Sequence, residues 1–209
     1  PIQNLDLSGC SSLDSGSLCQ FLRECKASLR HLSLQGCIRI GPAVVDVIAE
    51  KHTQLLSIWL GGCSQAIGNR SIRPLLQNLQ HLKHLDLQAL KNITDLSGDF
   101  MRLLPASIQS LNFSSCKQLR LGGMEALEAI QVHTNHGNHM RGGNWNNAPR
   151  SRHQLLHIVL DAIGTPRIGL CRGILTYFAL GRSLREVHLA GCEQVEDWEV
   201  EALAVTCAQ

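Results

Sequence analysis

The sequence has few aromatic residues, little net charge and no long apolar run, and each of these absences narrows its function. Phe, Trp and Tyr make up only 4% of the 209 residues, so the core must be mostly aliphatic. A formal net charge of +2 provides no field that would attract nucleic acid or a membrane surface. No apolar stretch approaches the ~18 residues of a membrane span, and residues 1–7 lack the pattern of a signal peptide. We therefore expect neither a membrane nor a nucleic-acid partner.

Paired cysteine motifs and catalytic motifs are also missing. The nine cysteines are an odd number and contain no CxxC pair, which favours reduced thiols and a cytoplasmic or nuclear location over a secreted disulfide framework. The sequence contains no G-x-G-x-x-G, P-loop, G-x-S-x-G or H-E-x-x-H motif, and no carboxylate pair or Cys with a plausible His partner stands out. We expect a protein that is not an enzyme and needs no cofactor.

What the sequence does contain is an internal repeat, L-x-x-L-x-L-x-x-C. Four close copies lie at 2–10, 29–37, 55–63 and 184–192, and three looser copies lie at 82–90, 108–116 and 155–163. The first five copies begin 27, 26, 27 and 26 residues apart, which is the period of a leucine-rich repeat.

Each repeat predicts one strand and one helix. The L-x-L alternation is typical of a short strand with its apolar side chains turned inward, and apolar residues at helical spacing follow it, as at Val44, Val45, Val47 and Ile48. In the fourth repeat, Thr94 or Asp95 is a candidate helix cap. Such units cannot bury their apolar faces alone and must stack. The predicted fold is α/β: a horseshoe-shaped leucine-rich-repeat solenoid of about seven repeats, with a parallel concave sheet and outer helices.

We expect residues 1–209 to form one solenoid domain that is part of a longer polypeptide, because neither end has the polar character of a cap. Between the fifth and sixth motifs, residues 131–153 are rich in Asn, Gly, His and Arg and lack apolar periodicity. This composition predicts an inserted mobile loop.

The repeats resemble the cysteine-containing leucine-rich repeats of the F-box and leucine-rich-repeat proteins. The resemblance rests on the seven copies, the Gly-Cys endings such as Gly36-Cys37, the Ile93-Thr94-Asp95 turn, and the helical cysteines Cys25 and Cys207. It implies a protein-protein interaction module, namely the substrate-recognition repeats of an F-box-type SCF ubiquitin-ligase receptor. No candidate F-box lies within the chain, so contact with the cullin-ligase adaptor would require one upstream. The alternative is a structural subunit of a large multiprotein assembly without a ubiquitin-ligase role.

The candidate binding residues are the outward positions of the strands, because solenoids commonly bind partners on the concave sheet. These positions hold Trp59, His31, Ser33, Ser57, His84, Asp86, Asn112, His157, Asp161, Glu186 and His188. Trp59 is the first candidate for an interface anchor, and packing along a neighbouring strand is the other interpretation. The three histidines His31, His84 and His157 alternate with serines along the sheet. Neighbouring histidines would therefore stand two strand spacings, or roughly 9 to 10 Å, apart, which is too far to share a metal ion.

The cysteines at the strand ends (Cys10, Cys37, Cys63, Cys116 and Cys192) are interpreted as small core residues rather than as a metal or redox set. The helical cysteines Cys19, Cys25, Cys171 and Cys207 receive the same interpretation. In the inserted loop, Trp145 and Arg141 are candidate contacts with a partner. His133, His136 and His139 have a spacing compatible with a metal ion, but the loop has no cysteine or carboxylate to complete a zinc site, and we predict no metal site.

Overall fold

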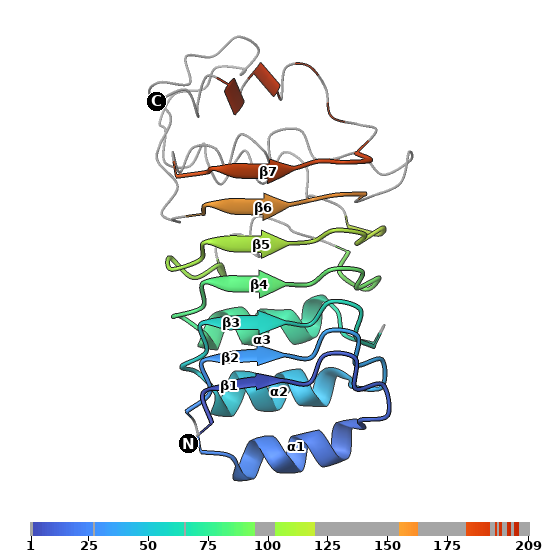
Figure 1. The fold of residues 1–209 in the computed structure, drawn as a ribbon, viewed down its shortest axis with the longest axis vertical. Helices are drawn as coiled ribbons and strands as arrows, with labels where there is room; N and C mark the ends of the chain where they lie inside the picture. The colour runs from blue at the N-terminus through green and yellow to red at the C-terminus, as the bar shows by residue number, and fades with distance from the viewer. Residues whose placement is uncertain are drawn as a thin grey trace.

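The computed structural model describes residues 2–26, 28–64, 66–94, 103–119, 155–162 and 183–192, together with residues 195, 197, 200, 201, 203 and 204. Seven three-residue strands form one parallel sheet in chain order, and Figure 1 shows them stacked one above the next. The strands are β1 (Asn4–Asp6), β2 (His31–Ser33), β3 (Ser57–Trp59), β4 (His84–Asp86), β5 (Ser110–Asn112), β6 (His157–Val159) and β7 (Glu186–His188).

The strands lie where the repeat motif predicts them. In each copy the strand covers the same three places of the motif, and equivalent places pair between neighbours, so that Leu5 is opposite Leu32 and Leu32 is opposite Ile58. The same register continues through β7. The predicted α/β leucine-rich-repeat solenoid with a parallel sheet is therefore confirmed.

Three helices follow the first three strands; in Figure 1 the second and third pass behind the strands, and the first lies below β1. They are α1 (Ser15–Glu24), α2 (Pro42–Lys51) and α3 (Asn69–Asn78). The Asp14 side chain caps α1 by accepting a hydrogen bond from the Ser17 backbone N–H, and Pro42 opens α2 at a position where no N–H is needed. The four helical residues predicted from spacing in the second repeat are all buried in α2. Thr94 pairs with Asn69, while Asp95 and the helix predicted after it lie outside the described residues.

The core lies between the sheet and the helices and is aliphatic, as the composition predicts. Its buried side chains in the described part of the chain are Leu, Ile, Val, Ala and Cys, with Phe113 as the aromatic member. The motif leucines of the second repeat, such as Leu29, Leu32 and Leu34, are fully buried. They are covered on both sides because a repeat precedes and follows them in the sheet.

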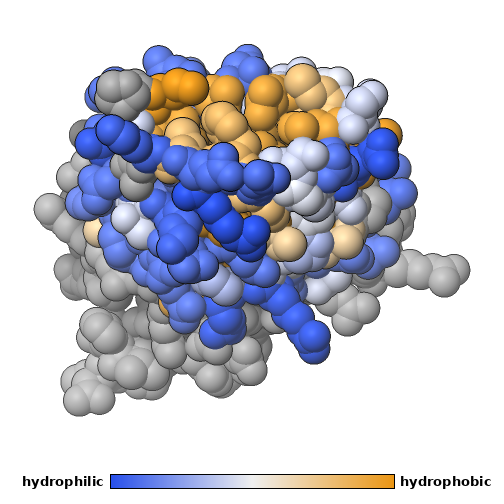
Figure 2. Space-filling view, turned by 90° about the horizontal axis from the view of Figure 1, so that it is seen from below, coloured by the Kyte–Doolittle hydropathy of each residue, from blue (hydrophilic) through white to orange (hydrophobic). Residues whose placement is uncertain are grey.

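The first repeat differs from those that follow it. Its core-facing Leu5, Leu7 and Leu13 are only partly buried, and Figure 2 shows an apolar patch ringed by polar side chains on this end of the molecule. Cys10 was expected in the core but is exposed, so that prediction is wrong at this position. The reason is geometric: a strand-end cysteine is buried against the repeat that precedes it.

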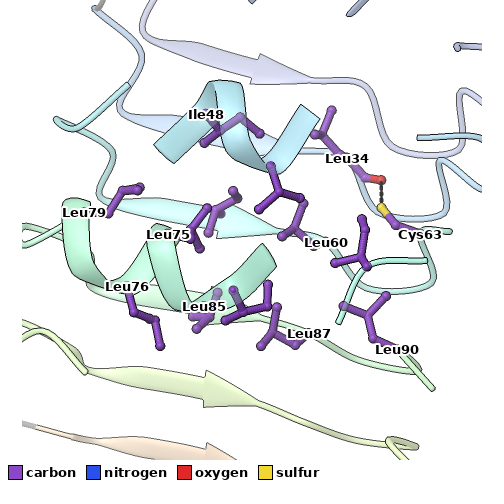
Figure 3. Packing of buried hydrophobic residues seen from close by; sticks show 14 of the residues in the cluster. Leu34, Ile48, Leu60, Cys63, Leu75, Leu76, Leu79, Leu85, Leu87 and Leu90 are labelled. Carbon is purple, nitrogen blue, oxygen red and sulfur yellow. Dashed lines mark hydrogen bonds between the residues drawn. The ribbon is translucent and has the colours of Figure 1, made fainter. Parts of the chain in front are cut away.

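Of the other strand-end cysteines, Cys37, Cys63 and Cys116 are buried in the core and Cys192 is partly buried against it, and all four donate hydrogen bonds. The thiol of Cys63 donates to the carbonyl of Leu34 at 2.9 Å (Figure 3), and Cys37 donates to Leu7 in the same way. Cys116 and Cys192 repeat the contact with Leu87 and Leu160. Each thiol therefore joins two successive repeats, a role that their interpretation as small apolar residues did not include.

Candidate protein-binding face

The sheet surface turned away from the helices carries three parallel rows of side chains, which we call the open face. The first and second rows are the first and last residues of the seven strands, which point outward. The third row is the residue two places after the end of each strand. The first row is Asn4, His31, Ser57, His84, Ser110, His157 and Glu186; the second is Asp6, Ser33, Trp59, Asp86, Asn112, Val159 and His188; the third is Ser8, Gln35, Gly61, Gln88, Ser114, Asp161 and Ala190.

The predicted binding residues all lie on the open face where the structure describes them. Those that are at least partly exposed are His31, Ser33, Trp59, His84, Asp86, Asn112, His157, Asp161, Glu186 and His188. Ser57 differs, because it is only 1% exposed. Its hydroxyl shares a 3.0 Å hydrogen bond with Nδ1 of His31. Ser57 therefore orients His31 rather than offering a surface of its own.

Trp59 lies on the interior strand β3, between β2 and β4. It pairs with Ser33 on one side and Asp86 on the other, both of which carry small side chains. Trp59 is partly buried and keeps a solvent-exposed part. A partly exposed Trp flanked by smaller polar residues provides a rigid apolar surface for a partner.

Asp86 is the most constrained acid on the open face. Its Oδ1 accepts a hydrogen bond from the Gln88 backbone N–H at 2.9 Å, and its Oδ2 accepts one from Asn112 Nδ2 at 2.7 Å. Burial raises the pKa of Asp86, and these two hydrogen bonds oppose that rise. Gly61 makes room for the carboxylate, since a Cβ there would lie 2.8 Å from Asp86 Oδ1.

The same bond to the backbone two residues onward recurs along the second row. Asp6 accepts from the Ser8 N–H and Asn112 accepts from the Ser114 N–H, at 2.9 and 3.0 Å. The hydrogen bonds from Ser8 lower the pKa of Asp6, because they favour the ionised carboxylate. These contacts fix the side chains of the second row at strand spacing and leave little rotamer freedom to lose on binding.

The histidines of the first row stand in different environments. Nδ1 of His157 lies 2.8 Å from Oε2 of Glu186. Partial burial lowers the pKa of His84, and the nearby basic groups of His31, Lys83 and His157 lower it further. The serines between the histidines keep them two strands apart, as predicted. Among the described residues, no group of three metal-binding side chains is found.

The open face carries four carboxylates and no Lys or Arg in its three rows. The acids are Asp6, Asp86, Asp161 and Glu186, and the remaining titratable groups are histidines. The three rows are therefore negative when the histidines are neutral, and Lys83 beside His84 offsets part of that charge.

The whole loop 131–153 lies outside the described residues, and with it lie the candidate residues Trp145, Arg141, His133, His136 and His139.

None of the helices in the described ranges is long and apolar enough to cross a membrane.

One recurring contact was not anticipated from the sequence. A serine just before the motif donates to the carbonyl of the first motif residue in the preceding repeat: Ser28 to Ile2, Ser107 to Leu82 and Ser183 to Leu155, each at 2.8 Å. The signal available in the sequence was the recurrence of Ser immediately before the motif.

Comparisons with known proteins give only distant likenesses. No protein-family model matches the chain, and no curated protein matches it either. Among solved structures, the complex of Rad7 and Elc1 in yeast contains a chain that is 13% identical with a TM-score of 0.45; the match covers 98% of this chain and 60% of that one. The leucine-rich-repeat-containing protein LegL7 from Legionella pneumophila is 14% identical with a TM-score of 0.33, over 100% of this chain and 91% of that one.

Proposed function

We propose that the chain is a protein-binding module that holds its partner on the open face, with Trp59 as the anchor. The observation that carries the proposal is the partly exposed Trp59 between Ser33 and Asp86, in a surface whose polar side chains are fixed by hydrogen bonds. Exposed Trp in a rigid setting is over-represented among the residues that dominate interface energies.

The test is partner capture by Trp59→Ala beside a matched control. Ile38 is a large apolar residue that is 60% exposed but lies outside the three rows, so Ile38→Ala removes a comparable apolar surface elsewhere. We expect W59A to weaken capture by at least about tenfold, or ~1.4 kcal/mol, which exceeds the ~1 kcal/mol that most interface residues do not reach when truncated. I38A should leave capture unchanged. Equal effects of both variants, or none from W59A, would remove the open face from the proposal.

The charge of the open face supports a partner that presents Lys or Arg. Four carboxylates without a basic residue in the three rows favour a cationic partner surface. Association should then slow as salt rises, because long-range steering is screened. A rate of association independent of ionic strength would argue for a neutral partner.

As the biological setting, we propose substrate recognition in an F-box-type SCF ubiquitin-ligase receptor located in the cytoplasm or nucleus. Support comes from the cysteine-ended repeat and its resemblance to the F-box and leucine-rich-repeat proteins, and from the free cysteines of the described residues. In this setting the chain binds the substrate and performs no chemistry of its own.

Co-purification of the tagged full-length polypeptide from its own cells tests this setting. An adaptor and a cullin should co-purify, and the captured partner should become ubiquitylated in a reaction that W59A weakens. Stable, stoichiometric association with a large complex that has no ubiquitin-transfer activity would instead establish the structural-subunit alternative.

A further inference from the structure

The end of the molecule next to β1 has the features of an uncovered contact between repeats. Ile2 is 47% exposed, whereas Leu29, the equivalent residue of the next repeat, is fully buried. Leu5, Leu7 and Leu13 show the same contrast with Leu32, Leu34 and Ile40. Figure 2 shows the resulting apolar patch and its polar rim. The first repeat thus carries the full apolar template of a repeat while only one of its two sides is covered.

The backbone at this end carries carbonyl groups at the same positions as those that accept hydrogen bonds between the other strands. The carbonyls of Ser33 and Gln35 in the second repeat accept hydrogen bonds from Leu7 and Gly9 in the first. The equivalent carbonyls of the first repeat belong to Asp6 and Ser8, and β1 is the end strand of the described sheet. Donors from a further parallel strand in the same register would meet these two carbonyls.

A third observation is the thiol of Cys10. Four other described repeats end their motif in a cysteine that is buried or partly buried. In each of them the thiol donates a hydrogen bond to a carbonyl of the preceding repeat. Cys10 occupies the same place in the motif and is free and exposed. It is therefore positioned to donate to the equivalent carbonyl of a repeat on the other side of β1.

We infer that the β1 end face is an inter-repeat docking surface whose occupant is one further leucine-rich repeat, which pairs with β1 in parallel. The occupant is specified by continuity with the six strand contacts of the sheet, which all have this direction and register. An apolar helix from elsewhere would cover the patch but would leave the carbonyls of Asp6 and Ser8 without donors. A second copy related by a two-fold axis would meet β1 antiparallel.

The inference is tested by adding a repeat and measuring the reactivity of Cys10. A copy of residues 29–54 placed directly before Pro1 sets its first leucine 27 residues before Ile2, since the copy supplies 26 residues and Pro1 supplies one. This step equals that between the first two motifs. The extended chain is treated with a thiol reagent, and labelling at Cys10 is followed by peptide mass spectrometry. We expect labelling of Cys10 to slow by on the order of tenfold or more, towards the rate of buried Cys37.

A matched control carries the same copy with its two strand leucines replaced, Leu32→Asp and Leu34→Asp in the copy only, so that it has the same length but cannot pack. Cys10 should react in this control as fast as in the 209-residue chain. A second extension with a copy of residues 55–81 guards against failure of one particular copy to fold.

Two results would overturn the inference. The first is fast labelling of Cys10 in both extended chains while Cys37 stays protected. This result would mean that the β1 end face is folded but the added repeat does not pack on it. The second is slow labelling of Cys10 in the unextended chain that speeds up on dilution, because a second copy would then occupy the face. The measurement does not involve the open face, so its outcome is independent of the proposed function.

Discussion

The turn after each strand places one residue at positive φ, immediately before the last position of the motif. Glycine occupies it at Gly9, Gly36, Gly62 and Gly191, with φ between 66° and 74°. Three repeats instead have Ala89, Ser115 and Ala162 there, with φ of 58°, 60° and 51°. A residue with a Cβ is strained in this region, whereas glycine is not. The Gly-Cys ending of the motif is thus explained at its glycine by backbone conformation.

This difference predicts opposite effects for two single substitutions. Ala89→Gly should increase the free energy of unfolding by about 0.5 to 1 kcal/mol, because relief of strain exceeds the entropy that glycine adds to the unfolded chain. Gly36→Ala should lower it by about 1 kcal/mol. The nearest atoms to a Cβ at Gly36 are 3.7 Å away, so backbone strain alone is tested there. Urea unfolding of both variants measures the effects, and a destabilising A89G would contradict the argument.

The buried cysteines have unreactive thiols. Burial raises the pKa of Cys63 to about 12 and that of Cys116 to about 11, so both stay protonated at neutral pH. A protonated thiol is a poor nucleophile and a poor metal ligand but keeps its proton for a hydrogen bond. The thiol-to-carbonyl contacts between repeats depend on that protonation.

At the scale of the single repeat, stability depends on whether neighbours cover both sides. Leu5 and Leu32 occupy the same place in the motif and are paired in the sheet, but Leu32 is fully buried and Leu5 is only partly buried. Leu32→Ala should cost about 3 to 5 kcal/mol, from lost burial and the cavity left behind. Leu5→Ala should cost less than about half as much. Equal costs, measured by chemical denaturation, would show that Leu5 is covered in solution.

The buried side chain of His52 also contributes to the contact between two repeats. His52 follows α2, is fully buried, and its Nε2 lies 3.0 Å from the carbonyl of Leu22 in the preceding repeat, while Nδ1 has no hydrogen-bond partner. Burial lowers the pKa of His52 from its ordinary value of 6.5, and the contact with Leu22 opposes the shift. The neutral imidazole therefore links α1 to the end of α2.

The lowered pKa of His52 predicts that acid destabilises the fold. Below about pH 6.5 the unfolded chain binds a proton at His52 while the folded chain does not, so the free energy of unfolding falls as pH decreases through that range. Above it this contribution is fully present. His52→Gln should flatten the dependence of Tm on pH between about pH 5 and 7. The matched control is His81→Gln, since His81 is exposed. An unchanged slope in H52Q would exclude His52 as the cause.

At the scale of the whole molecule, the repeat period predicted the strands and their register, because one alternating pattern fixes which residues face the core. Leu32 and Ile58 pair as that pattern requires. The sequence did not predict the exposure of Cys10 or the burial of Ser57, since each depends on what lies on the neighbouring strand. For the candidate site, the pattern placed Trp59 and Asp86 on one face, but the bonds from Gln88 and Asn112 depend on distances that no spacing specifies.

The linear order of the sheet predicts how stability is distributed. In a solenoid each repeat contacts only its neighbours, so an end repeat has one stabilising interface and an interior repeat has two. Both β3 and β4 lie between other strands, and their inward-facing Ile58 and Leu85 are buried. The β1 strand has one neighbour and a partly buried Leu5. Among β1 to β4, native-state hydrogen exchange should therefore be fastest in β1 and slowest in β3 and β4.

The decisive comparison is between amides that make the same bond in different repeats. The Leu7 N–H donates to Ser33, and the Leu60 N–H makes the equivalent bond to Asp86, both at 2.9 Å. Hydrogen-bond geometry is thus matched, and only the number of covered sides differs. Exchange of Leu7 should require opening of the first repeat alone, whereas exchange of Leu60 should require near-global unfolding. Equal protection of the two amides would mean that the described repeats unfold as one unit, and that the exposed end costs the solenoid no local stability.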